Sequence, residues 1–304
     1  MTEDFTSYFN GEWIPMQDCK LSMDDRGATL GDSVFEVERT FNFNVFDLEG
    51  HMDRLFRSLK YTRIDPGLTR DDIMRISREA VDRNKHLIAD GGDMNVRQVI
   101  TRGRGGSVTD DVPATVYIAA YNLNFSRYAS LYEEGAHVVF ARTRAYHPDS
   151  LDPKVKHTSR MNFVLANLET SDVDPDSYPV LLDLDGNISE GTGFNFWIVT
   201  DGALRGPGDR TILQGVSRKN IMELADDLGI PVILEDIQLY DAYTADEAFV
   251  SGTSNCLLPV SKLDNRPLGG TVPGPIVSQL LAAWSEKVGV DIIGQAQSRA
   301  KLGG

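Results

Sequence analysis

The feature that most constrains the fold is the order of the apolar segments. Candidate strands outnumber candidate helices, and several strands follow one another as hairpins instead of alternating with helices. A doubly wound parallel sheet needs regular alternation of strand and helix. The sequence therefore predicts an α+β protein. With 304 residues and no clear internal repeat, the chain is long enough for about two domains.

The first part of the chain indicates a small domain over residues 1–121. A helix is expected over His51–Leu59, where Met52, Leu55, Phe56 and Leu59 form an apolar stripe. A second helix is expected after Thr69, a suitable N-cap followed by acidic residues. A Gly-rich turn at Arg102–Gly106 is expected to join two paired strands. The strands expected in this domain cover residues 34–41, 44–47, 95–101 and 115–121.

The polar, weakly patterned stretch 122–135 is expected to be an interdomain linker, followed by a larger domain over residues 136–304. There, Ser217 is expected to cap one helix and Pro275 to open another. A further helix over residues 159–172 places four apolar side chains on one face, Met161, Val164, Leu165 and Leu168. Strands are expected at residues 136–141, 180–184, 194–200 and 232–235.

Composition excludes several classes of function. The formal net charge is -15, which disfavours binding to nucleic acid and to anionic membranes. No apolar run approaches the roughly 20 residues that span a bilayer. The two cysteines, Cys19 and Cys256, cannot form a disulfide framework, and the chain does not begin with a basic-then-apolar leader pattern, so we expect a reducing, cytoplasmic location.

The common catalytic motifs are also missing from the sequence. The five histidines show no HExxH spacing, there is no Cys-x-x-Cys pair, and we expect no metal site. There is no GxSxG elbow, no Walker loop and no GxGxxG motif after a strand. The candidates that remain are short polar segments in the second half of the chain.

Three of these segments could each bind part of one ligand. A lysine in Asp152–Phe163 lies just before a predicted helix, where a helix N-terminus and burial would lower its pKa; a surface loop is the simpler alternative. Glu190 lies among small residues and, if buried, needs a partner such as a protonated ring nitrogen; a surface turn is the alternative. The amides of Val216 and Ser217 at a helix start would bind an anion, unless this is an ordinary capped helix. A hydroxyl-rich turn at Val250–Asn255 ends a strand.

An aldehyde-binding lysine, a carboxylate for a ring nitrogen and a phosphate site are what pyridoxal 5'-phosphate requires. In the order of its motifs, the chain resembles the class IV aminotransferases, the fold-type IV pyridoxal-phosphate enzymes, over nearly its whole length. The resemblance implies a small N-terminal α/β domain, a larger C-terminal pseudo-barrel domain, and a homodimer. The segments that carry it are Arg26–Glu36, His51–Leu55, Lys156, Ser189–Asn195, Leu213–Arg218, Ala245–Val250, Ser251–Thr253 and Pro273–Pro275.

The resemblance also implies roles for individual residues. Lys156, with Lys154 as its nearest competitor, matches the lysine that forms the Schiff base and then moves a proton between substrate and cofactor. Glu190 matches the carboxylate that keeps the pyridine nitrogen protonated, and Arg54 matches an arginine that binds the phosphate. The remaining cofactor-binding positions that match are Leu213, Val216, Ser217 and Thr253.

Substrate-binding positions follow from the same resemblance. Phe35, Val37 and Arg39 alternate along one strand and match pocket positions in branched-chain, D-amino-acid and (R)-amine transaminases. Arg97 matches an arginine of the branched-chain enzymes, although Asn95 and Met161 replace tyrosines found there. The substrate carboxylate could bind to side chains or to backbone groups, and the candidates are Arg39, Arg97, Arg102, Arg104, Thr253 and Ser254.

The implied reaction is transfer of an amino group from an amino acid, of branched-chain or D-type, or from an (R)-primary amine, to a 2-keto acid. Two alternatives remain. Lys156–Arg160 and Ile100–Gly106 resemble segments of 4-amino-4-deoxychorismate lyases, but Ser107 stands where those lyases carry an arginine. A non-enzymatic binding protein of the same fold is the other, and the presence of Lys156, Glu190 and Arg54 together argues against it.

Overall fold

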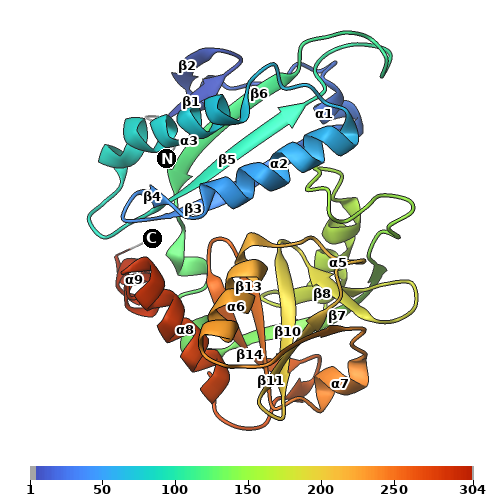
Figure 1. The fold of residues 1–304 in the computed structure, drawn as a ribbon, viewed down its shortest axis with the longest axis vertical. Helices are drawn as coiled ribbons and strands as arrows, with labels where there is room; N and C mark the ends of the chain where they lie inside the picture. Colours follow the sequence, from blue (N-terminus) through green and yellow to red (C-terminus); the bar gives the residue numbers. More distant parts are fainter. Residues whose placement is uncertain (1–4, 303–304) are drawn as a thin grey trace. The chain divides into compact units, whose positions relative to one another are not determined.

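The computed structural model describes residues 5–302, and the chain forms two compact units (Figure 1). The first unit contains the residues up to Leu123 together with Val155–Ser159. The second contains Asn124–Lys154 and the residues from Arg160 onward. Both units combine helices with hairpin-connected strands, which confirms the α+β prediction.

The first unit is built on a six-stranded antiparallel sheet in the order β2-β1-β6-β5-β3-β4. The expected pairing of residues 95–101 with residues 115–121 is present, with Thr101 opposite Thr115 next to the Gly-rich turn. The strands are β1 (Thr6–Phe9), β2 (Glu12–Pro15), β3 (Ser33–Phe41), β4 (Asn44–Val45), β5 (Met94–Thr101) and β6 (Thr115–Asn122).

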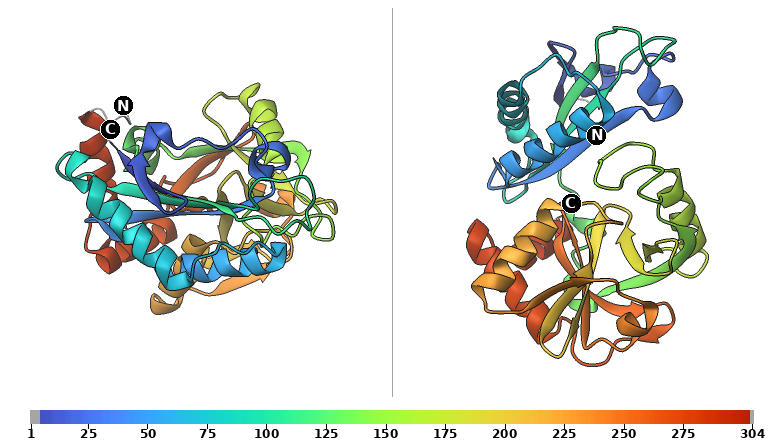
Figure 2. Two further views of the ribbon diagram at one scale, coloured as in Figure 1. Left: turned by 90° about the horizontal axis from the view of Figure 1, so that it is seen from above. Right: turned by 45° about the vertical axis from the view of Figure 1, so that its right-hand side comes forward.

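Two helices, α2 (Leu48–Thr62) and α3 (Arg70–Asn84), cover one face of this sheet (Figures 1 and 2). Thr69 caps α3 as predicted: its hydroxyl accepts from the amide of Asp72, and the carboxylate of Asp72 accepts from the amide of Thr69. A short helix, α1 (Arg26–Leu30), precedes β3. The core lies between the sheet and the two long helices.

The segment Val155–Ser159 packs against the edge of β3. The amide of Phe35 donates to the carbonyl of Lys156 at 2.9 Å, and the amide of Thr158 donates to the carbonyl of Ser33 at 3.1 Å. The boundaries expected from sequence assign this segment to the larger domain. In the structure, Lys156 is part of the first unit.

The second unit contains a closed barrel. Its six strands pair in the order β10-β13-β14-β7-β8-β9, and pairing of β9 with β10 closes the ring. This confirms the expected pseudo-barrel. The barrel strands are β7 (Ala136–Arg144), β8 (Tyr178–Leu182), β9 (Ile188–Gly191), β10 (Phe194–Thr200), β13 (Glu247–Gly252) and β14 (Cys256–Leu263). Three further strands extend the sheet, β11 (Ala203–Pro207), β12 (Val232–Glu235) and β15 (Arg266–Pro267).

Helices pack around this barrel, with α5 on one side and α6 and α8 on the other (Figure 2). Glu247 on β13 fixes the start of α8, because its carboxylate accepts from the amides of Ile276 and Val277. The helices are α4 (Leu131–Glu134), α5 (Met161–Ser171), α6 (Val216–Asp227), α7 (Leu239–Tyr243), α8 (Pro275–Val288) and α9 (Ile292–Lys301). In the part of the chain that is described, no helix is long and apolar enough to cross a membrane.

The stretch 122–135, expected as a linker, is ordered structure that belongs to the second unit from Asn124 onward. Phe125, Tyr128 and Tyr132 are buried there. The hydroxyl of Tyr128 donates to the carbonyl of Ser254 at 2.9 Å. These aromatic residues therefore anchor the segment to the barrel.

Candidate active site

One face of the first unit's sheet gathers several predicted site residues. Along β3, Glu36 and Glu38 are fully buried on the face that α2 and α3 cover, whereas Phe35 and Val37 are half-buried on the other face. Val37 lies opposite Arg97 of β5, so the two side chains share that face.

The ring of Phe35 lies close to two cationic groups. The Lys156 Nζ is 4.9 Å from the ring centroid, and the Arg97 Cζ is 5.3 Å from it. Both distances are within the range of cation–π attraction. The structure thus brings Lys156, the predicted catalytic lysine, together with Phe35 and Arg97, two predicted substrate residues.

Arg97 lacks a protein counter-ion within residues 5–302. No carboxylate oxygen in that range lies within 4.0 Å of its guanidinium nitrogens, and its buried Nε has no hydrogen-bond partner there. A partly buried guanidinium without a carboxylate is costly unless a ligand supplies the negative charge. This geometry suits a residue that binds a substrate carboxylate.

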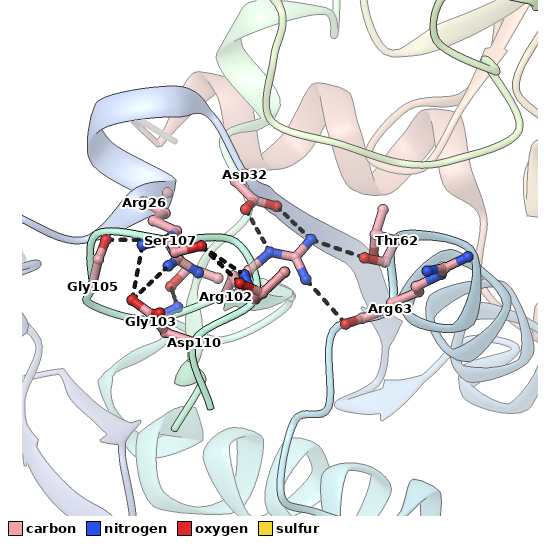
Figure 3. A network of polar contacts seen from close by, with 12 residues as sticks. Arg26, Asp32, Thr62, Arg63, Arg102, Gly103, Gly105, Ser107 and Asp110 are labelled. Carbon is pink, nitrogen blue, oxygen red and sulfur yellow. Dashed lines mark hydrogen bonds and ion pairs between the residues drawn. The ribbon is translucent and has the colours of Figure 1, made fainter. Parts of the chain in front are cut away.

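The other predicted arginines are engaged with the protein. Arg39 is 2% exposed, stacks on Phe41 with 4.0 Å between Cζ and the ring centroid, and lies 4.0 Å from the carboxylate of Asp93. Arg102 bonds Asp32 at 2.6 Å and the carbonyl of Thr62 at 2.8 Å (Figure 3). Arg39 and Arg102 are thus each engaged with other groups of the first unit.

Arg104 is the most exposed of these candidates. Its side chain is 67% exposed and lies 2.8 Å from Asp24. Hydrogen bonding to Arg104 lowers the pKa of Asp24 to about 2. An exposed, paired guanidinium of this kind is a weaker candidate for a carboxylate site than Arg97.

Arg54 is buried and is held by Glu36. Its Nε lies 2.6 Å from one Glu36 oxygen and its Nη2 lies 2.7 Å from the other, while His51 bonds the same carboxylate at 2.8 Å. Burial alone would raise the pKa of Glu36, but Arg54 and His51 outweigh it and hold that pKa well below its ordinary range. Arg54 was expected to bind a phosphate. In the structure, its Nε and Nη2 make a bidentate contact with the Glu36 carboxylate instead.

Glu38 completes this cluster on the same face of β3 as Glu36. Burial and the neighbouring charge of Glu36 raise the pKa of Glu38 well above its ordinary range, and Gln98 donates to it at 2.9 Å. Ligand atoms of Glu36, Glu38 and His51 lie within 4.8 Å of one another, as in some metal sites. The Arg54 guanidinium supplies the positive charge in this cluster.

In the second unit, Glu190 lies on β9 and is 8% exposed. Its Oε2 accepts from the amide of Leu213 at 2.9 Å. Burial lowers the pKa of Arg218, and Asp209 and Glu190 partly offset this effect. Glu190 is therefore a buried carboxylate held by a backbone amide near a buried arginine.

Helix α6 begins at Val216, three residues beyond Leu213. Its N-cap is Gly215 and not Ser217 as predicted, so no side chain among the described residues caps the helix. Val216 and Ser217 are 7% and 8% exposed, and in the described range the Ser217 hydroxyl has no hydrogen-bond partner. Buried first-turn amides that lack a cap are suited to bind an anion.

Thr253 and Ser254 form the turn between β13 and β14. Tyr128 bonds the carbonyl of Ser254, and Tyr132 bonds the carbonyl of Asn255 at 2.7 Å. The turn directly follows β13, which pairs with β10, and β10 pairs with β9, the strand of Glu190. The second unit therefore brings together the predicted residues Glu190, Leu213, Val216, Ser217, Thr253 and Ser254.

Sequence reasoning gave no role to some residues of this site. Asn195 lies opposite Glu190 in the β9–β10 hairpin and donates to the carbonyl of Leu213 at 3.0 Å. The two-residue turn Thr192–Gly193 between these strands, with its second residue at φ +97°, was a signal that could have placed Asn195 beside Glu190. Tyr128 and Tyr132 gave no such signal, because they bond carbonyls more than 120 residues away.

Comparison with known proteins gives one consistent result. Residues 33–263 match the family model described as amino-transferase class IV. A Methanocaldococcus jannaschii protein that carries the name of a branched-chain-amino-acid aminotransferase is 34% identical over 277 residues, covering 90% of this chain and 93% of the relative. The D-alanine aminotransferase of Staphylococcus aureus strain N315 is 28% identical, covering 92% and 97%.

Solved structures agree. The branched-chain amino acid aminotransferase of Escherichia coli has a TM-score of 0.86 and 27% identity, covering 92% of this chain and 93% of that one. A T.th. branched-chain amino acid aminotransferase with pyridoxamine 5'-phosphate has a TM-score of 0.85 and 27% identity, covering 95% of each chain. These matches do not favour the 4-amino-4-deoxychorismate lyase alternative.

Proposed function

The chain belongs to the class IV aminotransferases and is therefore a pyridoxal-phosphate-dependent transaminase of amino acids and 2-keto acids, and we propose that its donors are amino acids of the branched-chain type. The observation that carries the cofactor site is the arrangement around Leu213. A buried carboxylate bonds the amide of this residue, and an uncapped helix begins three residues later, at Val216.

The residues present fit the cofactor. We propose that the amides of Val216 and Ser217, with Thr253, bind its phosphate, that Leu213 contacts its ring, and that Glu190 holds the ring nitrogen protonated. Arg54 is a weaker phosphate candidate, because two of its nitrogens bond Glu36. The buried, uncapped start of α6 and its available Ser217 hydroxyl support the phosphate assignment. The hydrogen bond from the Leu213 amide to Glu190 supports the ring-nitrogen assignment, because it orients the buried carboxylate.

When bound, pyridoxal phosphate supplies an aldehyde that accepts the amino group and a protonated ring that withdraws electrons. We propose that Lys156 binds the aldehyde and moves the proton at the substrate Cα. The donor amino acid becomes a 2-keto acid and the acceptor 2-keto acid becomes an amino acid, so the reaction needs no external oxidant or reductant.

The first unit supports the proposed substrate assignment. Phe35 and Val37 would contact the donor side chain, and Arg97 would bind a carboxylate, because it lies on the same sheet face and has no protein carboxylate partner in residues 5–302. Thr253 and Ser254 would supply backbone donors. Arg39 and Arg104 are weaker candidates, since each is paired with an aspartate.

Two measurements test this function. Borohydride reduction of the holoenzyme followed by peptide mapping should label Lys156; a label on Lys154, or on no lysine, would contradict the assignment. A panel of L-branched-chain amino acids, D-amino acids and (R)- and (S)-1-phenylethylamine, each with pyruvate or 2-oxoglutarate, should show fastest turnover with the L-branched-chain donors. Preference for D-amino acids or (R)-amine would overturn the donor assignment while leaving the transaminase intact.

We further propose that the protein is a homodimer. The apolar stripe expected on one face of α5 is present but exposed, with Met161 65%, Val164 50%, Leu165 46% and Leu168 61% exposed. A helix face of this kind normally packs against another surface, and a second copy of the chain is the partner that the family resemblance implies.

The two cysteines are free thiols, which supports a reducing, cytoplasmic location.

Light scattering on a size-exclusion column tests the dimer. Leu168→Glu should convert the dimer to monomer, whereas Tyr240→Glu, at a residue of α7 that is 75% exposed, should leave the dimer unchanged. A dimer that survives Leu168→Glu would rule out this helix face as the interface.

A further inference from the structure

The backbone amide and the backbone carbonyl of Leu213 are both hydrogen-bonded to one hairpin, β9–β10. Glu190 on β9 accepts from its amide at 2.9 Å, and Asn195 on β10 donates to its carbonyl at 3.0 Å. The residue before Glu190 adds a third contact, because the Ser189 hydroxyl donates to the carbonyl of Thr211 at 2.5 Å. The loop that leads into α6 is thus tied to β9 and β10.

The hairpin register explains why Asn195 can act with Glu190. The two residues are direct partners across β9 and β10, so their side chains lie on the same face of the barrel. Asn195 is 5% exposed, and a buried amide must be hydrogen-bonded within the protein.

Asn195 also contacts the residue that begins α6. A Cβ added to Gly215 would overlap the Asn195 Oδ1, closer than real atoms approach. Gly215 has an ordinary φ of −64°, so space and not backbone strain requires glycine here. The absence of a side chain lets the first turn of α6 lie directly against Asn195.

We propose that Asn195 is a positioning residue that sets the distance between the Glu190 carboxylate and the N-terminus of α6. The inference rests on the proposed function, in which Glu190 holds the ring nitrogen and α6 binds the phosphate. The cofactor's ring fixes the separation of these two groups, so both contacts form at full strength only when the protein matches that separation.

This inference predicts which ligands lose affinity when Asn195 is changed. In apoprotein titrations, Asn195→Ala should weaken binding of pyridoxal phosphate by about 10- to 100-fold, the range typical for loss of a residue that orients a ligand-binding group. Pyridoxal, which lacks the phosphate, and inorganic phosphate should each bind within about 3-fold of wild type, because each uses only one end of the site.

A matched control separates this role from general damage. Asn220 is also buried, lies on α6, and accepts from Lys287 at 2.6 Å, but within the described residues its side chain makes no hydrogen bond to the Leu213 loop. Asn220→Ala should leave the affinity for pyridoxal phosphate within about 3-fold of wild type. Equal losses for all three ligands in Asn195→Ala, or no loss for any of them, would overturn the inference.

A double-mutant cycle provides a second test that does not depend on Asn195→Ala alone. Gly215→Ala should weaken binding of pyridoxal phosphate because its Cβ would displace Asn195 or the helix start. The double variant should lose less than the product of the two single losses, since removing the Asn195 amide makes room for the Cβ. Independent effects would contradict the proposed contact.

The same experiments distinguish failure of this inference from failure of the proposed function. If the wild-type holoenzyme carries no borohydride label on Lys156, the proposed function fails. If Lys156 is labelled in wild type but Asn195→Ala binds all three ligands normally, only the positioning role of Asn195 is wrong.

Discussion

Glu36 in the first unit and Glu190 in the second are both buried carboxylates, but different kinds of group hold them. Side chains neutralise Glu36, since the Arg54 guanidinium bonds both of its oxygens and His51 bonds one. For Glu190, the structure gives a bond from the backbone amide of Leu213. A backbone amide orients the Glu190 carboxylate, and the charge of Glu190 also acts on Arg160 and Arg218 in the same unit, whereas Arg54 bonds both oxygens of Glu36 directly.

The difference teaches which carboxylate is suited to a ligand. The charge of Glu36 is matched within its own unit, so its main effect is on the stability and orientation of Arg54. Glu190 lies near the uncapped start of α6, where we propose that its charge stabilises a protonated group on a bound molecule. Four substitutions test this distinction.

The largest effect on stability is expected for Glu36→Gln. It leaves the Arg54 guanidinium, 4% exposed, without its negative partner. Breaking a buried ion pair in this way typically lowers the free energy of unfolding by about 3–5 kcal/mol. Urea unfolding of the apoprotein measures this change. A loss below about 1 kcal/mol would show that Arg54 does not depend on Glu36.

Glu190→Gln should give the opposite pattern. Turnover should fall by about 10²-fold or more, because the charge that stabilises the protonated ring is lost. The free energy of unfolding should change by less than about 1 kcal/mol, since the glutamine oxygen can still accept from Leu213. Steady-state kinetics and urea unfolding on the same samples compare the two effects. Near-normal turnover would assign the role to another residue.

Much of this contrast could be predicted from the sequence. The turn-rich segment around Glu190 and the helix start after Gly215 are local patterns, and local hydrogen bonding fixes both. The N-cap at Thr69 is local in the same way, because its partner is three residues away. Among these local features, the N-cap predicted for α6 was wrong: it is Gly215 and not Ser217. Serine is a better capping residue than glycine when neighbouring residues are ignored.

Non-local contacts could not be predicted in the same way. Lys156 is placed by pairing with Phe35, more than 100 residues earlier, and no local pattern encodes that strand edge. The contacts of Arg102 are non-local as well, because it donates to the carbonyls of Thr62 and Arg63 at the end of α2. The burial of Glu36 and Glu38 depends on Arg54 and on helix packing, whereas two glutamates on one strand face usually indicate exposure.

Arg97→Gln sharpens the comparison on the substrate side, with a smaller expected effect. Loss of one charge-assisted contact should raise the KM for a 2-keto acid by about 10-fold or somewhat more. The half-reaction with a carboxylate-free amine should change little. Arg104→Gln is the matched control and should leave both values near wild type, because Arg104 is exposed and bonds Asp24. Equal losses with both kinds of donor would make Arg97 a structural brace.

Glu38→Gln should have the smallest effect and a distinctive pH dependence. Burial and the charge of Glu36 raise the pKa of Glu38, so the folded protein keeps this proton at pH values where the unfolded chain, with a glutamate pKa of about 4.3, has lost it. Wild-type stability should therefore fall relative to Glu38→Gln as pH rises above about 4.3. The pH dependence that Glu36 contributes has the opposite sign, since its lowered pKa contributes stability above that value and this stability is lost as pH falls.

Near pH 4, Glu38→Gln should change the free energy of unfolding by less than about 1 kcal/mol, because an amide replaces a neutral acid of the same size. Urea unfolding of both proteins from pH 4 to pH 8 measures the difference. A stability difference between the two proteins that does not widen with rising pH would mean that the pKa of Glu38 is not raised in the folded protein.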